Sequence, residues 1–148
     1  MPGTCAKSYP VVMQLTMENA GNPARIEHYD EGLVRIAGQT CRGTVLVTGS
    51  AVHSPWGPET PAGIHAGHIE SLLELQPELV LLGTGAQALF PPREALRLAI
   101  RAGIGIEVMT TAAACRTHNV VIAEGRNVAT LLFMIEAPCA TAQGMAGR

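Results

Sequence analysis

Short runs of alternating apolar and polar residues fill the first half of the chain. Residues 26–37 alternate on both sides of a Gly-containing turn, and this pattern predicts a β-hairpin. A further apolar run at residues 44–48 predicts another strand. Residues 54–63 contain three prolines and the sole tryptophan, Trp56. Because proline lacks a backbone donor, this stretch predicts a long irregular loop.

Helical and extended patterns follow one another in the second half. The predicted elements are a helix at residues 68–76, a strand at 79–82, a helix led by Pro91-Pro92, a strand at 104–109, a short helix at 112–117, and two strands at 119–123 and 128–133 joined by a hairpin at 124–127. The strand–helix–strand unit from Leu79 to Met109 is long enough for a right-handed parallel crossover.

These elements predict a three-layer α/β fold, with a central mixed β-sheet, flanking helices and a smaller N-terminal β-layer. At 148 residues the chain is expected to form one domain. We place this domain at residues 25–137, after an irregular lead at residues 1–24 and before a loose tail at residues 138–148.

Composition and charge exclude several classes of function. A net charge of −2 with scattered basic residues argues against nucleic-acid binding, and the chain has no apolar run long enough to span a membrane. Its four cysteines lie far apart and in no paired pattern, so neither a disulfide framework nor a metal site is expected. They are interpreted as reduced thiols of a cytoplasmic protein. Nine arginines against one lysine favour a bacterial source.

Gly83-Thr84-Gly85 follows a buried strand in the manner of a dinucleotide-binding loop. Such a loop must open directly into a helix, so that the helix N-terminus faces the phosphates. Here the next helix cannot begin before Pro91 or Pro92, so nucleotide binding is the least favoured interpretation and no cofactor is expected. Exposed backbone amides in a tight turn are the simpler hypothesis.

Cys115 and His118 are close enough in sequence to suggest a thiolate–imidazole pair. A buried cysteine that behaves as a small hydrophobe is the commoner arrangement. Arg116 beside it would lower the thiol pKa, so a small-molecule or redox enzyme using Cys115 remains the alternative.

The order of these motifs resembles a known family. Gly-Thr-Gly, a Pro-led helix, Gly-Ile-Gly-Ile-Glu-Val, Thr-x-x-Ala-Cys-Arg-Thr-x-Asn and Glu-Gly-Arg follow one another as in a domain of unknown function. Its eukaryotic members are the mitochondrial NADH dehydrogenase (complex I) alpha subcomplex assembly factor 3 and an adipogenesis-associated cytosolic protein. The resemblance extends from about Ile26 to Phe133.

The resemblance implies a three-layer α/β fold and a role in protein assembly without established catalysis. The positions carried over from it are Trp56, Gly83, Thr84, Gly85, Glu107, Thr110, Cys115, Thr117, Asn119, Glu124, Gly125 and Arg126. His118 departs from the family pattern, which weakens the idea of a Cys–His pair.

A candidate site follows from the predicted sheet. Parallel strands before Gly83 and Thr110 would end at one edge, where open α/β sheets bind ligands. Together with the loop of Trp56, the expected crevice residues are Gly83, Thr84, Gly85, Thr110, Cys115, Arg116, Thr117 and Asn119. Exposed amides there would suit an anion or a carboxylate of a partner. The sequence thus predicts a non-catalytic binding or assembly module whose partner is another protein. A homodimer formed through an edge strand of the N-terminal β-layer is also compatible with the pattern.

Overall fold

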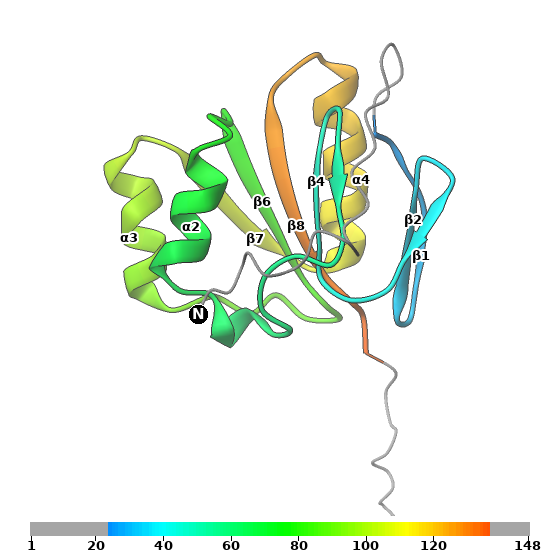
Figure 1. Cartoon of the computed structure of the whole chain (residues 1–148), viewed down its shortest axis with the longest axis horizontal. Helices are drawn as coiled ribbons and strands as arrows, with labels where there is room; N and C mark the ends of the chain where they lie inside the picture. The colour runs from blue at the N-terminus through cyan, green and yellow to red at the C-terminus, as the bar shows by residue number, and fades with distance from the viewer. Residues whose placement is uncertain (1–23, 137–148) are drawn as a thin grey trace, which may run out of the picture.

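A five-stranded mixed sheet forms the centre of the molecule (Figure 1). The computed structural model describes residues 24–136. The strands lie in the order β5 (Val52–His53), β4 (Val45–Thr48), β8 (Val128–Phe133), β6 (Leu79–Thr84) and β7 (Gly105–Met109). The strands β8, β6 and β7 are parallel, whereas β4 pairs antiparallel with β8 and with β5.

The N-terminal half forms a separate three-stranded antiparallel sheet. It consists of β1 (Ile26–Asp30), β2 (Leu33–Ile36) and β3 (Gln39–Cys41). Gly32 turns β1 into β2 with a φ of 76°, a backbone conformation that glycine adopts at little cost. The predicted hairpin and the smaller β-layer are therefore confirmed.

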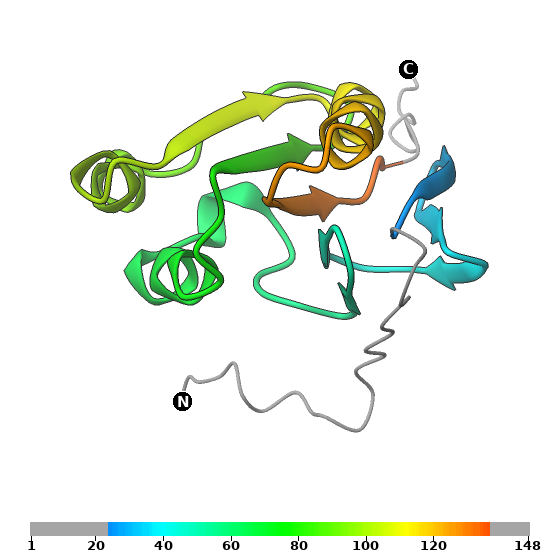
Figure 2. The ribbon, with the colours of Figure 1, turned by 90° about the horizontal axis from the view of Figure 1, so that it is seen from above.

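Within the described part of the chain, three α-helices cover the central sheet. They are α2 (Ala66–Leu73), α3 (Arg93–Arg101) and α4 (Thr111–Ala123), and a 3₁₀ turn at Pro61–Gly63 precedes α2. Helices α2 and α3 pack on one face, while α4 lies on the other face, between the central sheet and the β-layer (Figure 2). The three-layer α/β prediction is confirmed.

Apolar side chains pack on both faces of the central sheet. On the α2 and α3 face, buried Ile69, Leu72 and Ala99 pack against alternate residues of β4, β6 and β8. On the α4 face, Ala114 and Cys115 pack against the β-layer. Alternate residues of β8 point to opposite faces, so all six of its residues are buried.

The sequence prediction was wrong at residues 119–123, which continue α4 instead of forming a strand. The buried residues Ala114, His118 and Val121 follow the i, i+4, i+7 spacing of a helix, while Val120 between them is exposed. The predicted hairpin at residues 124–127 is therefore a helix-to-strand turn, in which Gly125 has a φ of 77°. The run Val-Val-Ile resembles a strand, but burial on only one side of it selects the helix.

The predicted crossover is confirmed. Strands β6 and β7 run parallel, with Gly83 opposite Met109, and α3 connects them. Their carboxyl ends therefore lie at one edge of the sheet, as the site hypothesis requires. The predicted lead at residues 1–24 lies, except for Ala24, outside the described residues, and so does the predicted tail at residues 138–148.

Candidate binding pocket at the carboxyl edge of the sheet

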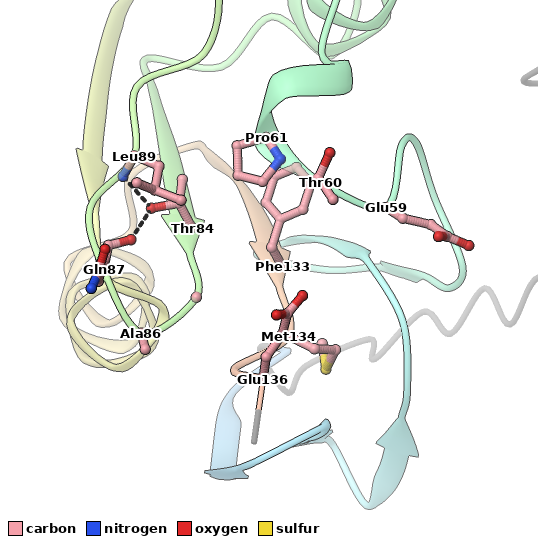
Figure 3. A pocket seen from close by; sticks show the side chains of 11 residues that line it. Glu59, Thr60, Pro61, Thr84, Ala86, Gln87, Leu89, Phe133, Met134 and Glu136 are labelled. Carbon is pink, nitrogen blue, oxygen red and sulfur yellow. Dashed lines mark hydrogen bonds between the residues drawn. The ribbon is translucent and has the colours of Figure 1, made fainter. Parts of the chain in front are cut away.

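A pocket opens where three chain segments meet at the carboxyl ends of β6 and β8. The cavity has a volume of about 370 Å³, which is within the size range of small-ligand sites. Figure 3 shows the loop after β6 on one side and Thr60, Pro61 and Phe133 together on the other. The lining residues are Glu59, Thr60, Pro61, Thr84, Gly85, Ala86, Gln87, Leu89, Phe133, Met134 and Glu136.

Thr84 holds the loop after β6 in shape. Its buried hydroxyl accepts a hydrogen bond from the Leu89 N–H at 2.8 Å and donates to the Gln87 carbonyl at 2.6 Å. Gly85 follows with a φ of 93°, which disfavours any other residue. The Thr84 side chain, at the end of β6, thus fixes the pocket wall that consists of Ala86, Gln87 and Leu89.

Thr111, the first residue of α4, joins two walls of the pocket. Its hydroxyl accepts from the Gly85 N–H at 2.8 Å and donates to the Phe133 carbonyl at 2.6 Å. Its own N–H donates to the Gly85 carbonyl at 2.9 Å. Thr111 is fully buried, so these bonds are shielded from water. The sequence analysis did not assign it this role, because nothing local in the sequence indicates contacts 22 and 26 residues away.

The lining is acidic and apolar. Glu59 and Glu136 are the only ionisable groups among the described residues that line it, and both are exposed at the rim. Pro61, Leu89, Phe133 and Met134 supply apolar surface. Because residues 24–136 supply carboxylates and no basic side chain to the lining, it does not favour the anion that was expected from the sequence.

Phe90 extends the apolar surface beyond the pocket. Its side chain is 72% exposed, and the neighbouring Leu89 is 48% exposed. Two adjacent large apolar side chains in solvent, next to a cavity, are typical of a surface that contacts another molecule.

The structure places three of the predicted crevice residues close to this pocket. Thr84 and Gly85 line it. Thr110 lies beside it at the start of α4, where its hydroxyl accepts from the Ala113 N–H at 3.2 Å and caps the helix. Gly83 is buried beneath α4, since a Cβ there would lie 2.9 Å from both the Ala114 Cβ and the Thr111 Cα.

The remaining predicted residues on α4 do not line the pocket. Arg116 donates to the Tyr29 hydroxyl at 3.0 Å, and Asn119 bonds both the N–H and the C=O of Ile26. Both therefore connect α4 to the β-layer. Thr117 is half-buried on the same helix.

Trp56, in the loop at residues 54–63, does not line the pocket either. It packs against the α2 and α3 core, with its ring 5.9 Å from that of His68.

Cys115 is 1% exposed and packs among the apolar residues between α4 and the β-layer. Burial raises the pKa of its thiol to about 12, and the nearby Arg116 offsets this only in part. The group is therefore a neutral thiol at physiological pH. A redox or nucleophilic role requires an accessible thiolate, which these surroundings disfavour.

His118 does not pair with Cys115 in the manner of a catalytic dyad. Its Nε2 donates to the Ala24 carbonyl and its Nδ1 accepts from the Thr130 hydroxyl, both at 2.9 Å. Both ring nitrogens are thus occupied, and burial lowers the pKa of the imidazole. His118 acts as a structural link between α4, β8 and the start of β1.

Metal ligands are not assembled anywhere in residues 24–136, where no three His, Cys, Asp or Glu side chains come together. His65 and His68 instead cap α2 reciprocally. The His65 Nδ1 accepts from the Gly67 N–H, and the His68 Nδ1 accepts from the His65 N–H, both at 3.1 Å. The two imidazoles therefore stabilise the start of α2.

A family model described as "Protein of unknown function (DUF498/DUF598)" matches residues 26–133. The chain belongs to this family. The DUF498/DUF598 assignment spans all the elements of the fold from β1 to β8. It confirms the relationship to a domain of unknown function, and it indicates no catalytic role.

Two bacterial relatives are similar in sequence. An uncharacterised protein of Rhodobacter capsulatus is 35% identical over 119 residues, which cover 79% of this chain and 90% of that protein. A protein of Francisella tularensis named "13 kDa major membrane protein" is 35% identical over 70 residues. That match covers 47% of this chain and only 57% of the relative. Among residues 24–136, no helix has the length and apolarity that crossing a bilayer requires.

Solved structures share the fold. A crystal structure from Bordetella parapertussis has a TM-score of 0.72 and 28% identity, covering 78% of this chain and 99% of that one. A Bordetella pertussis protein described as an Mth938-like domain has a TM-score of 0.67 at 23% identity, covering 76% and 87% of the two chains. The DUF498/DUF598 chain therefore has an Mth938-like α/β fold.

Proposed function

We propose that this DUF498/DUF598 protein is a non-catalytic binding module that contributes to protein assembly. Its partner would be another protein, held at the pocket between the carboxyl ends of β6 and β8. The observation that carries the proposal is the exposed pair Leu89 and Phe90 beside an acidic, apolar cavity of about 370 Å³. The assembly role rests on the resemblance to the complex I assembly factor.

The lining supports a partner of a particular chemistry. An apolar side chain fits against Leu89 and Phe133, and a lysine or arginine of the same segment would approach Glu59 or Glu136 at the rim. Rim charges of this kind accelerate association and select the partner, while the apolar contacts supply most of the affinity. A cytoplasmic location, with thiols kept reduced, completes the proposal.

The alternative is a redox or small-molecule enzyme that uses Cys115. The burial of that thiol and its raised pKa weigh against it. Nucleotide binding at Gly83–Gly85 has less support still, because Gly83 is buried beneath α4 and the next helix begins only at Arg93.

Site-specific photo-cross-linking in the source cell tests the proposal. A photoreactive amino acid replaces Gln87, which lines the pocket and is exposed. The matched control carries the same residue at Ser71, which is exposed on α2 and away from the pocket. We expect a defined protein adduct at position 87 that is absent at position 71.

Binding of the identified protein is then measured by calorimetry with purified components. Phe90→Ala is expected to weaken binding by at least tenfold, or about 1.4 kcal/mol, because it removes an exposed anchor. Phe90 is outside the core, so the variant should retain its melting temperature. Equal adducts at both positions, or an unchanged dissociation constant, would refute the proposed site.

A further inference from the structure

Strand β7 is an open edge of the central sheet. It stands last in the strand order, and within residues 24–136 no strand pairs with its outer side. Unpaired backbone groups on an edge strand can bond a strand of another molecule.

The hydrogen bonds at the end of β7 fix this orientation. The Met109 carbonyl lies 3.3 Å from the Thr84 hydroxyl, so it points toward β6. In a parallel pair, one residue directs both its N–H and its C=O to the same neighbour, and the next residue directs both to the opposite side. Gly105, Glu107 and Met109 therefore bond β6, whereas Ile106 and Val108 present their N–H and C=O groups outward.

We propose that β7 pairs antiparallel with β7 of a second copy of this chain, with Ile106 at the two-fold axis. In this register the two Ile106 residues exchange N–H and C=O bonds, and Val108 donates to the Ile104 carbonyl of the other copy. The central sheet then continues through both molecules. This inference does not depend on the proposed function, because β7 takes no part in lining the pocket.

The side chains of β7 suit a second copy in this register. Each exposed Glu107 lies opposite Gly105 of the other copy, which has no side chain to oppose it. On the other face, Ile106 meets Ile106, and Ile104 meets Val108, so branched apolar side chains pair with one another. The neighbouring register, centred on Glu107, would set two carboxylates face to face and is disfavoured.

Helix α4 adds apolar surface beside this edge. Ile122 faces the β4 side, since its Cγ2 lies 3.7 Å from the position of a Cβ on Gly49. Val120, two residues earlier, lies on the opposite side of the helix and therefore on the β7 side. Its side chain is 58% exposed. A sheet continued through β7 places the α4 helices of both copies on the same face of that sheet. Val120 would then become more buried in the dimer.

The sequence pattern was also compatible with a homodimer through an edge strand of the β-layer, whose two edges are β1 and β3. The β1 edge is less suited to such pairing, because the Asn119 side chain already bonds both the N–H and the C=O of Ile26. An incoming strand would have to displace this side chain.

Charge substitution at Gly105 tests the proposal in the full-length protein. Gly105 is exposed, and a Cβ there meets only the Leu79 Cδ1, at 3.8 Å, so a side chain fits in the monomer. Gly105→Glu places a carboxylate opposite Glu107 of the second copy, and Gly105→Lys places an ammonium there. Sedimentation equilibrium over a range of concentrations measures the dimer dissociation constant of each.

We expect a monomer–dimer equilibrium in the wild type. At low salt, Gly105→Glu should raise the dimer dissociation constant and Gly105→Lys should lower it, each by roughly fivefold to tenfold. Added salt should reduce the difference between the two variants. Val108→Pro removes an outward N–H without removing a bond to β6, and it should leave the chain folded and monomeric.

Three outcomes would overturn the proposal. The first is a wild type that stays monomeric at all concentrations. The second is a shift of both Gly105 variants in the same direction, which would indicate a general effect on folding. The third is a dimer that none of the three substitutions changes, which would place the interface on another surface, such as the β-layer.

Discussion

Gly83 shows how closely α4 approaches the central sheet. A Cβ at this position would lie 2.9 Å from the Thr111 Cα, which is backbone and cannot rotate away. We expect Gly83→Ala to destabilise the protein by about 2 kcal/mol, because the helix must move from β6. Urea unfolding followed by circular dichroism measures the change.

Gly49→Ala is the matched control for Gly83→Ala. The nearest atom to its added Cβ is the Ile122 Cγ2 at 3.7 Å, an ordinary contact. The free energy of unfolding of Gly49→Ala should differ from that of the wild type by less than about 1 kcal/mol. Equal unfolding midpoints for the two variants would contradict the close approach at Gly83.

The thiol of Cys115 distinguishes the binding module from the redox alternative. Because burial raises its pKa to about 12, we expect iodoacetamide at pH 7.5 to leave Cys115 unmodified in the folded protein. In urea the same residue should react fully. Peptide mass spectrometry follows this position separately from the other cysteines. Modification of the folded protein at the rate of the unfolded chain would instead support the redox alternative.

The sequence indicated which single residues are important near the pocket, but it did not indicate what each of them does. Gly83-Thr84-Gly85 was predicted as a tight turn with exposed amides, but Gly83 and Thr84 are the last residues of β6 and only Gly85 begins the turn. The Gly85 N–H is not exposed, because it donates to the buried Thr111 hydroxyl. Sequence could not show that Gly83 accommodates a helix while Thr84 organises the loop, since each role depends on a neighbour more than three residues away. Thr111 was passed over because both of its partners are distant in sequence.

At the scale of elements, Asn119 joins α4 to the β-layer. Its amide accepts from the Ile26 N–H at 2.9 Å and donates to the Ile26 carbonyl at 2.8 Å, as a paired strand would. Asn119→Ala leaves these half-buried groups without their partner. We expect a net loss of about 1–2 kcal/mol, since the better helix propensity of alanine offsets part of the cost.

Hydrogen exchange should locate this loss. Amides of β1 and β2 are expected to exchange faster in Asn119→Ala, while those of β6 and β8 keep their relative protection. Arg116→Ala serves as the control, because it removes one exposed hydrogen bond from the same helix to Tyr29 and should cost less than about 1 kcal/mol. Uniform acceleration across the whole fold would argue against a local role for Asn119.

Helices and strands with a strong period were predicted correctly, and the failure at residues 119–123 has a physical cause. Thr117, His118 and Asn119 interrupt the apolar pattern, so α4 appeared to end early. In the structure two of these polar residues are satisfied by tertiary contacts, His118 by Thr130 and Ala24, and Asn119 by Ile26. A sequence cannot reveal that a polar residue is buried with its partners.

At the scale of the whole molecule, the pocket depends on the order of the strands. Parallel pairing of β6 with β8 brings residues 84–89 beside residues 133–136, and the loop before α2 closes the third side. The sequence analysis predicted the edge correctly from the β6–β7 crossover. The position of β8 next to β6 was not predicted, because it is set by long-range pairing that no local pattern encodes.

The stability of the whole molecule should depend on pH through the buried His118 and the half-buried His53 and His68. Burial lowers the pKa of His53, His68 and His118, and His68 reaches about 4 with a further contribution from the nearby His65. The unfolded chain therefore binds more protons than the folded chain between about pH 4 and the ordinary histidine value of about 6.5. We expect the free energy of unfolding to be highest above pH 6.5 and to fall as the pH decreases through this window.

His68→Gln separates one contribution from the others. A glutamine at this helix position can still accept from the His65 N–H, as in a common capping box, but it does not titrate. Stability at pH 7.5 should therefore change little, whereas the loss between pH 6.5 and pH 4 should become smaller without vanishing, since His53 and His118 remain. Urea unfolding at constant ionic strength measures the free energy of unfolding of the wild type and of His68→Gln at each pH across the window. A wild-type stability that is flat from pH 7.5 to pH 4 would show that these imidazoles titrate alike in the folded and unfolded chain, and would contradict the structural role assigned to His118.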